Sequence, residues 1–155
     1  EATQTESQRQ ENTGTSPEGS YQKKYNSDDA VMMARTMWNE SRGIQSKTEI
    51  ACIGWTALNR VDAGAAAGFR DTLSGVLTQA NQFAYTTSDY GYNLVELATD
   101  VLDRWSREKA GQTNVGRVLP KDYKWYAGDG KHNYFRNQYQ GGTRWNYSLP
   151  SPYEN

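Results

Sequence analysis

The sequence predicts a single α+β domain that is mainly helical and carries a small antiparallel β-sheet or hairpin. Three stretches repeat apolar residues at the spacing of an amphipathic helix. Two short segments rich in aromatic residues follow towards the C-terminal end, joined by Gly128-Asp129-Gly130-Lys131. A glycine-rich connection between such segments is typical of a β-hairpin. At 155 residues, the chain is large enough for one modest hydrophobic core.

Residues 1–24 hold Gln, Glu, Ser, Thr, Gly and Pro and contain almost no apolar side chains. Such a segment cannot bury enough surface to offset the entropy lost on ordering. We therefore expect a disordered linker over residues 1–24 and a folded catalytic domain over residues 25–155. Because the chain starts with Glu1, we also expect that a signal or anchor preceded the domain.

The first helix is expected to begin at Ser27-Asp28-Asp29, where a capping hydroxyl precedes two acidic residues at the positive end of the helix dipole. Its apolar residues recur at helical spacing; they are Val31, Ala34, Met37 and Trp38. Gly43 is expected to end this helix.

A second helix is expected to follow from Ser46-Lys47-Thr48-Glu49, which has the pattern of a capping box. In that motif Ser46 caps the helix and Glu49 reaches back to it. The apolar stripe comprises Ile50, Ile53, Gly54, Ala57, Leu58 and Val61. The small residues Gly54 and Ala57 leave room for a closely packed neighbour.

The rest of the chain predicts a small-residue loop over 63–68, a short helix over 72–78 and a third long helix. Asn93-Leu94-Val95-Glu96 has the pattern of a second capping box. The core side of the helix that follows comprises Leu94, Leu97, Ala98, Val101, Leu102 and Trp105. Strands are expected over 123–127 and 133–139.

Composition narrows the range of functions. A net charge of −1 provides no electrostatic argument for binding nucleic acid or an anionic membrane. No stretch is apolar enough to span a bilayer. The 11 Tyr and 5 Trp outnumber the 3 Phe, so most aromatic rings carry a polar group. Such rings suit a wet groove that binds sugars or peptides, and equally a small core with polar edges at its surface.

Glu40 is the candidate catalytic residue. It follows Trp38 and Asn39 at the expected end of the first helix. A carboxyl group at a helix C-terminus, close to aromatic rings, suits a general acid. The alternative is an exposed glutamate paired with Arg42 or Lys47. Glu49 is a rival carboxyl group, but its capping role explains it.

Other hydrolytic chemistries find less support. A Ser–His or Cys–His pair would have to use His132, which lies in a polar turn. Cys52 lies among apolar residues of a predicted helix, as inert buried thiols do. One His and one Cys cannot build a usual zinc site, and no metal or other cofactor is expected. Glycosidases generally use two carboxyl groups. A lytic transglycosylase needs only one, because its nucleophile is the C6 hydroxyl of the substrate.

Several segments, in this order, resemble the spore cortex-lytic cell wall hydrolase family of the SleB/CwlJ type. That family combines Glu-Ala/Ser-Arg-Gly, a small-residue helix ending in Leu-Asn-Arg-Val, then Thr-Ile-Ser-Gly-Val-Ile and Gln-Phe-Ser. This chain has Glu40-Ser41-Arg42-Gly43, Leu58-Asn59-Arg60-Val61, residues 72–77 and Gln82-Phe83-Ala84. The resemblance covers about residues 28–86, and residues 123–135 fit it more loosely. The chain has Ser41 where the family usually has Ala, and Ala84 where it usually has Ser, and it carries a glycine-rich insertion over 63–68.

The resemblance implies a lysozyme-like fold, peptidoglycan glycan strands as substrate and partner, and action outside the cytoplasm. The family's catalytic glutamate falls on Glu40, and the implied reaction is lytic transglycosylation between muramic acid and glucosamine units. Asn59 and Arg60 are expected to give structural support. The residues expected to hold sugars are Trp38, Gln82, Phe83, Tyr85, Tyr126, His132, Asn133 and Tyr134. A hydrolysing lysozyme with a second carboxylate and a non-catalytic peptidoglycan-binding domain remain open alternatives.

Overall fold

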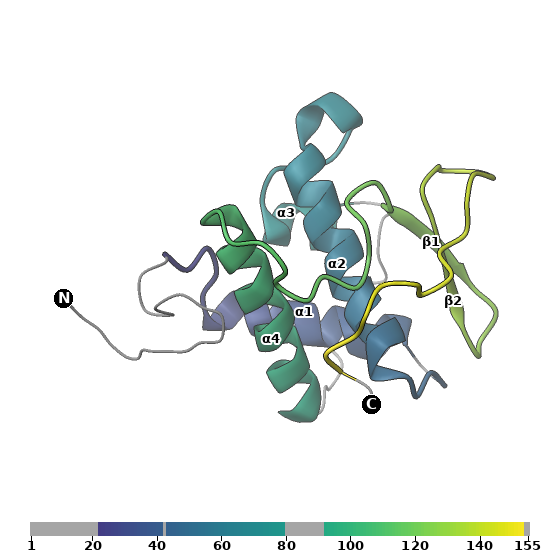
Figure 1. The fold of residues 1–155 in the computed structure, drawn as a ribbon, viewed down its shortest axis with the longest axis horizontal. Helices are drawn as coiled ribbons and strands as arrows, with labels where there is room; N and C mark the ends of the chain where they lie inside the picture. Colours follow the sequence, from purple (N-terminus) through teal and green to yellow (C-terminus); the bar gives the residue numbers. More distant parts are fainter. Residues whose placement is uncertain (1–21, 42, 80–91, 154–155) are drawn as a thin grey trace.

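A computed structural model describes residues 22–41, 43–79 and 92–153. Four helices pack together, and one two-stranded antiparallel hairpin lies at the side of the helices (Figure 1). The predicted α+β class is therefore confirmed. The elements are α1 (Ser27–Glu40), α2 (Lys47–Ala63), the 3-10 helix η2 (Ala65–Ala67), α3 (Leu73–Thr78), α4 (Tyr92–Lys109), β1 (Trp125–Gly128) and β2 (Asn133–Arg136).

Helix α2 is the centre of the domain. Helices α1, α3 and α4 all pack against it, and every residue from Thr48 to Arg60 is buried. The predicted apolar stripe therefore underestimated its burial, because neighbours cover the helix on more than one side. Gly54 of α2 packs closely against side chains of α1 and α4: an added Cβ would lie 2.9 Å from Met33 Sδ and 3.3 Å from Val101 Cγ1.

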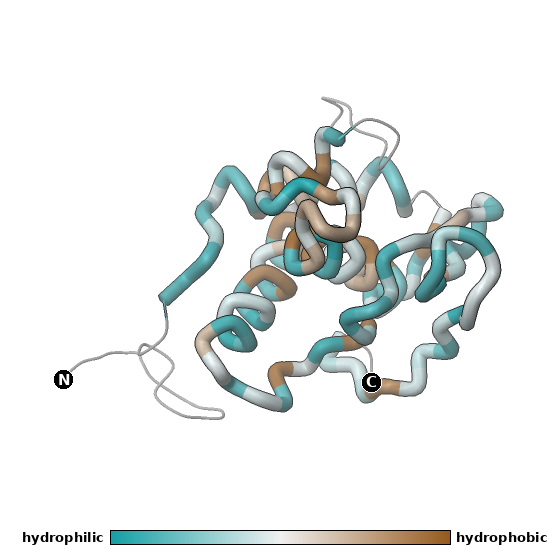
Figure 2. The backbone as a smooth tube through the Cα atoms, turned by 90° about the horizontal axis from the view of Figure 1, so that it is seen from above, coloured by the Kyte–Doolittle hydropathy of each residue, from teal (hydrophilic) through white to brown (hydrophobic). Residues whose placement is uncertain are grey.

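The hydrophobic core follows these helix contacts. All six residues predicted for the core side of α4 are buried, which confirms that stripe. Hydrophobic residues recur along the packed helices, whereas the part that holds the hairpin is mostly hydrophilic (Figure 2). Trp38 departs from the prediction, since its side chain is 38% exposed on α1. The buried face of α1 is made by Ala30, Met33, Ala34, Thr36 and Met37.

Two helix starts differ from the prediction. Helix α1 is capped by Asn26 instead of Ser27: the Asn26 side chain accepts a hydrogen bond from Asp29 N, and Asp29 reaches back to Asn26 N. Helix α4 begins at Tyr92, so Asn93 lies within its first turn and not at the cap. Of the expected linker, residues 1–21 lie outside the described part. Lys24 N donates to Ser106 Oγ of α4 at 2.9 Å.

The hairpin is shorter than predicted but lies at the predicted place. Strands β1 and β2 pair antiparallel, with Trp125 opposite Arg136 and Gly128 opposite Asn133. Asp129 orders the turn between them. Its Oδ1 accepts from the backbone N–H groups of Lys131 at 2.9 Å and of His132 at 2.8 Å. These bonds fix the backbone on which the His132 side chain is carried.

The end of α2 holds the chain that enters β1. Asn59 Nδ2 donates to the carbonyl oxygens of Pro120 and Tyr123, each at 2.9 Å. Arg60 Nε donates to the carbonyl oxygen of Lys124 at 2.7 Å. Both side chains are buried, and both donate to backbone carbonyl oxygens, which fits the expected supporting role. The neighbouring pair on α2 therefore sets where the hairpin lies.

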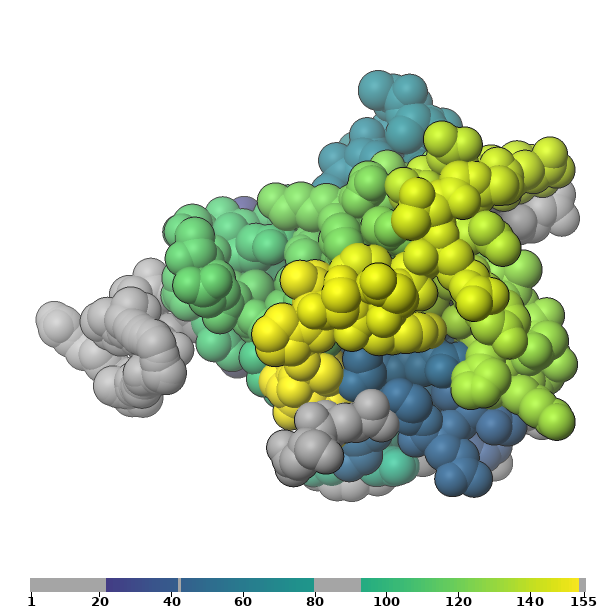
Figure 3. Space-filling view, turned by 45° about the vertical axis from the view of Figure 1, so that its right-hand side comes forward, coloured from purple at the N-terminus to yellow at the C-terminus, as the bar shows by residue number. Residues whose placement is uncertain are grey.

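The C-terminal segment crosses the surface between the hairpin and the helices (Figure 3). Trp145 N donates to Phe135 O at 2.7 Å, which ties the segment to β2. Further along, Ser151 Oγ and Thr48 Oγ1 of α2 are hydrogen-bonded at 2.6 Å. The segment thus joins β2 to the start of α2. Over the described ranges, no helix has the length and apolar character needed to cross a membrane.

Candidate functional site

Glu40 is the last residue of α1, and both strands of the hairpin contact it. Tyr126 of β1 donates its hydroxyl hydrogen to Glu40 Oε1 at 2.7 Å. Asn133 of β2 donates from Nδ2 to the Glu40 carbonyl oxygen at 2.8 Å. The last carbonyls of a helix lack partners within it, so Asn133 satisfies one of them. The half-buried Glu40 is therefore held both at its backbone and at its carboxyl group.

A cavity of about 350 Å³ is lined in part by Glu40. Four of its lining residues carry polar groups that were predicted for the site: the Glu40 carboxyl, the Tyr126 hydroxyl, the His132 imidazole and the Asn133 amide. The other lining residues are Asn39, Ile44, Gly128 and Gly130. The cavity therefore lies between the end of α1 and the hairpin, and most of its side chains can hydrogen-bond a polar ligand.

Burial shifts the pKa values of two ionisable side chains that act on Glu40, those of Tyr126 and Arg60. Burial, together with the negative charge of Glu40, holds the pKa of Tyr126 well above its ordinary value. The phenol therefore keeps its hydrogen and remains a donor to Glu40. Burial lowers the pKa of Arg60 to about 10, against the opposing effect of Tyr126 and Glu40. Arg60 consequently stays cationic at neutral pH, and its charge acts on Glu40 from within the fold.

The turn after α1 approaches the hairpin turn closely. Gly43 has a φ of 85°, in the left-handed region that favours glycine. A Cβ at this position would lie only 2.6 Å from the Gly130 carbonyl oxygen. Both its conformation and this contact require glycine, so Gly43 lets the two walls of the cavity meet.

Glu49 has a different role from the one predicted. Ser46 Oγ accepts a hydrogen bond from Glu49 N at 3.2 Å, so Ser46 is the expected cap. The Glu49 carboxyl group does not complete a capping box. It accepts from Asn133 N at 2.6 Å through Oε2, and its Oε1 lies 3.1 Å from His132 Nδ1. Nothing local in the sequence could indicate these partners, because they lie more than eighty residues further along the chain.

The remaining predicted site residues do not line the cavity or lie outside the described part. Trp38 is exposed on α1, and Tyr134 donates its hydroxyl hydrogen to Asp129 Oδ2 at 2.7 Å. Gln82, Phe83 and Tyr85 belong to the undescribed residues 80–91. Sequence reasoning missed Asn39 and Ile44 as lining residues, although their positions beside Glu40 and Gly43 were a usable signal.

Two further predictions concern reactive or metal-binding groups. Cys52 is fully buried, and burial raises the pKa of its thiol, as the prediction of an inert cysteine implied. Over the ranges that the structure describes, no three His, Cys, Asp or Glu side chains are grouped so as to hold a metal ion.

Comparison with known proteins yields no match. No protein-family model, no curated protein and no solved structure matches this chain. Membership of the cortex-lytic hydrolase family, and the chemistry that it implies, therefore remain predictions based on the sequence motifs.

Proposed function

We propose that this protein cleaves the glycan strands of peptidoglycan between muramic acid and glucosamine units, as a lytic transglycosylase with Glu40 as its acid. The observation that carries the proposal is the position of Glu40, whose Oε1 accepts a 2.7 Å hydrogen bond from Tyr126 beside a polar cavity. A catalytic acid must be held in one orientation and must be reachable by substrate. The hydrogen bond from Tyr126 supports the first requirement, and the place of Glu40 in the lining of the cavity supports the second.

In the proposed reaction, the Glu40 carboxyl hydrogen passes to the glycosidic oxygen as the bond from that oxygen to C1 breaks. The C6 hydroxyl of the same muramic acid unit attacks C1, and its hydrogen passes to the carboxylate. The products are a 1,6-anhydromuramoyl end and a free hydroxyl on the departing sugar, with no water consumed. This scheme requires no cofactor.

The lining of the cavity suits an uncharged, hydroxyl-rich ligand. The lining contains the amides of Asn39 and Asn133 and the ring of His132, which are side chains of the kind that bind sugar hydroxyl and N-acetyl groups. The resemblance to the SleB/CwlJ-type family implies a lysozyme-like helical lobe with a small β-sheet, and the packed helices and hairpin of this chain are compatible with that arrangement. On this proposal the protein works outside the cytoplasm, where peptidoglycan lies.

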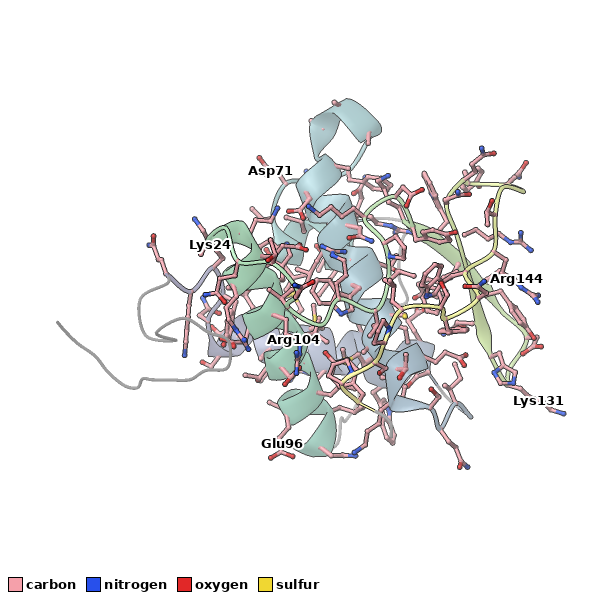
Figure 4. The ribbon with its side chains drawn as sticks, viewed as in Figure 1. Lys24, Asp71, Glu96, Arg104, Lys131 and Arg144 are labelled. Carbon is pink, nitrogen blue, oxygen red and sulfur yellow. The ribbon has the colours of Figure 1, made fainter. Side chains whose placement is uncertain are left out.

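The test compares the wild type with Glu40→Gln on purified sacculi, following loss of turbidity and release of soluble fragments. Glu40→Gln keeps the shape of the side chain but removes the transferable hydrogen. Glu96→Gln is the matched control, because Glu96 is an exposed glutamate on α4. Figure 4 shows it apart from the hairpin, whose position is marked by Lys131. We expect Glu40→Gln to abolish lysis and Glu96→Gln to retain it.

Mass spectrometry of the products then separates the alternatives. Anhydro ends support the transglycosylase, whereas ends that have gained water indicate a hydrolysing lysozyme with a second carboxylate. If the wild type binds sacculi without cleaving them, the domain is a non-catalytic peptidoglycan-binding module. If Glu40→Gln lyses sacculi as fast as Glu96→Gln, Glu40 is not the acid.

A further inference from the structure

A buried carboxylate and an exposed imidazole are paired at the edge of the cavity. Glu49 Oε1 lies 3.1 Å from His132 Nδ1. The Glu49 side chain is only 6% exposed, whereas that of His132 is 61% exposed. His132 also lines the cavity that Glu40 lines. The pair therefore joins the interior of the domain to the place where a substrate would lie.

The geometry sets the hydrogen positions on the imidazole. A carboxylate only accepts hydrogen bonds, and Oε2 of Glu49 already accepts from Asn133 N at 2.6 Å. The contact of Oε1 with His132 therefore requires a hydrogen on Nδ1. In the neutral ring, Nε2 then carries a lone pair and can accept a hydrogen. A buried carboxylate that orients an imidazole in this way is a recurring means of preparing a base.

The backbone of His132 is held by hydrogen bonds as well as its ring. Asp129 Oδ1 accepts from His132 N at 2.8 Å, and Glu49 itself accepts from the next residue, Asn133. The imidazole consequently has two fixed anchors despite its exposure.

We propose that His132 is a second catalytic residue whose Nε2 accepts the hydrogen of the hydroxyl that attacks C1, and that Glu49 is its positioning residue. This inference rests on the proposed function and changes only its second step. Glu40 gives its hydrogen to the glycosidic oxygen, and the bond from that oxygen to C1 breaks. The attacking oxygen forms its bond to C1, and its hydrogen passes to Nε2.

The resulting imidazolium is balanced by the Glu49 carboxylate. Solvent then carries the hydrogen from His132 back to Glu40, which restores both groups. The same step serves the C6 hydroxyl or a water molecule, so it does not depend on which product forms. It differs from the single-glutamate scheme in that Glu40 need not act as both acid and base.

The first test is His132→Ala, with Lys131→Ala as the neighbouring exposed control. General-base catalysis contributes about 10²–10⁴-fold, so kcat on sacculi should fall by at least about 10²-fold while KM changes little. Imidazole added to the solution should restore part of the activity of His132→Ala, because the vacated site is open to solvent. Lys131→Ala should keep the wild-type rate.

The second test is Glu49→Gln, alone and combined with His132→Ala. With the Gln oxygen accepting from Asn133 N, its NH₂ group donates to Nδ1 and moves the ring hydrogen to Nε2. In that tautomer Nε2 cannot accept the hydrogen of the attacking hydroxyl, so kcat should fall. Because Glu49 acts through His132, Glu49→Gln should cost nothing further in the His132→Ala background.

The outcomes separate the two proposals. An active wild type, an inactive Glu40→Gln and an unimpaired His132→Ala would overturn this inference and leave the proposed function standing. The inference would also be overturned if added imidazole did not restore the kcat of His132→Ala and if Glu49→Gln lowered kcat further in the His132→Ala background. A wild type that cleaves no peptidoglycan would overturn the proposed function itself.

Discussion

Replacing Asn59 by Ala should destabilise the domain more than any exposed polar substitution. Asn59 is 1% exposed and uses its whole amide group. Its Nδ2 donates to Pro120 O and Tyr123 O, each at 2.9 Å, and its Oδ1 accepts from Arg117 Nη1 at 2.7 Å. The substitution removes all three bonds and leaves the buried partners without them.

The size of the loss follows from these bonds. A neutral hydrogen bond stabilises a fold by about 1 kcal/mol net, and one to a charged group by about 2 kcal/mol. Arg117 retains its bonds to Glu108 and to Leu119 O, which limits the penalty at that side chain. We expect the free energy of unfolding to fall by about 3–4 kcal/mol, a large part of the roughly 5–15 kcal/mol that holds a domain folded.

Urea unfolding followed by tryptophan fluorescence measures this loss. With a slope of about 2 kcal/mol per molar urea, the midpoint should fall by roughly 1.5–2 M at an unchanged slope. Asn93→Ala is the matched control, because Asn93 is exposed on α4; its midpoint should move by less than about 0.3 M. A shift for Asn59→Ala as small as that of Asn93→Ala would refute the view that Asn59 anchors the hairpin.

Three further outcomes are expected. Gly43→Ala should lower both stability and lysis of sacculi more than Gly68→Ala does: both glycines have positive φ, but only at Gly43 does a Cβ meet backbone. Equal effects would show that the close approach to the hairpin is unimportant. Burial alone would raise the pKa of Glu108, but its bonds to Arg117 lower it overall. The ion pair with Arg117 therefore stabilises the fold fully above the ordinary pKa of a carboxyl group, and this stabilisation is lost as the pH falls through the lower pKa that Glu108 has in the folded protein. The difference in unfolding free energy between the wild type and Glu108→Gln should consequently shrink in acid. Burial raises the pKa of the Cys52 thiol, so a thiol reagent at pH 8 should label native protein only as fast as it unfolds; rapid labelling would contradict that burial.

Local signals in the sequence were enough to locate most of the secondary structure. Apolar periodicity predicted α4 and its core face, since a helix must bury the side chains that recur on one side. Gly128-Asp129-Gly130-Lys131 predicted the turn of the hairpin; in the structure Gly128 is the last residue of β1, and the turn follows it. The end of α1 at Glu40 was also predictable, because the glycine that follows cannot easily continue a helix.

Local signals were less reliable where tertiary contacts compete with them. The pattern at Ser46–Glu49 predicted that the glutamate would cap its own helix, but its carboxyl group binds the hairpin instead. Trp38 fits an apolar stripe by spacing and is nevertheless exposed. For Glu49 and Trp38, the neighbouring residues in the sequence suggested a role that the folded structure does not show. The actual environment of each side chain depends on how distant segments pack.

The sequence by itself determined which segments become helices, where the hairpin turns and which glutamate ends α1. The tertiary structure alone decided that Glu40 meets Tyr126 and Asn133, and that Glu49 meets His132, across 83–93 residues of chain. The physical reason is one of range. Helix periodicity, caps and turns depend on neighbours within a few residues, whereas a polar cavity forms only after the core has brought α1, α2 and the hairpin together.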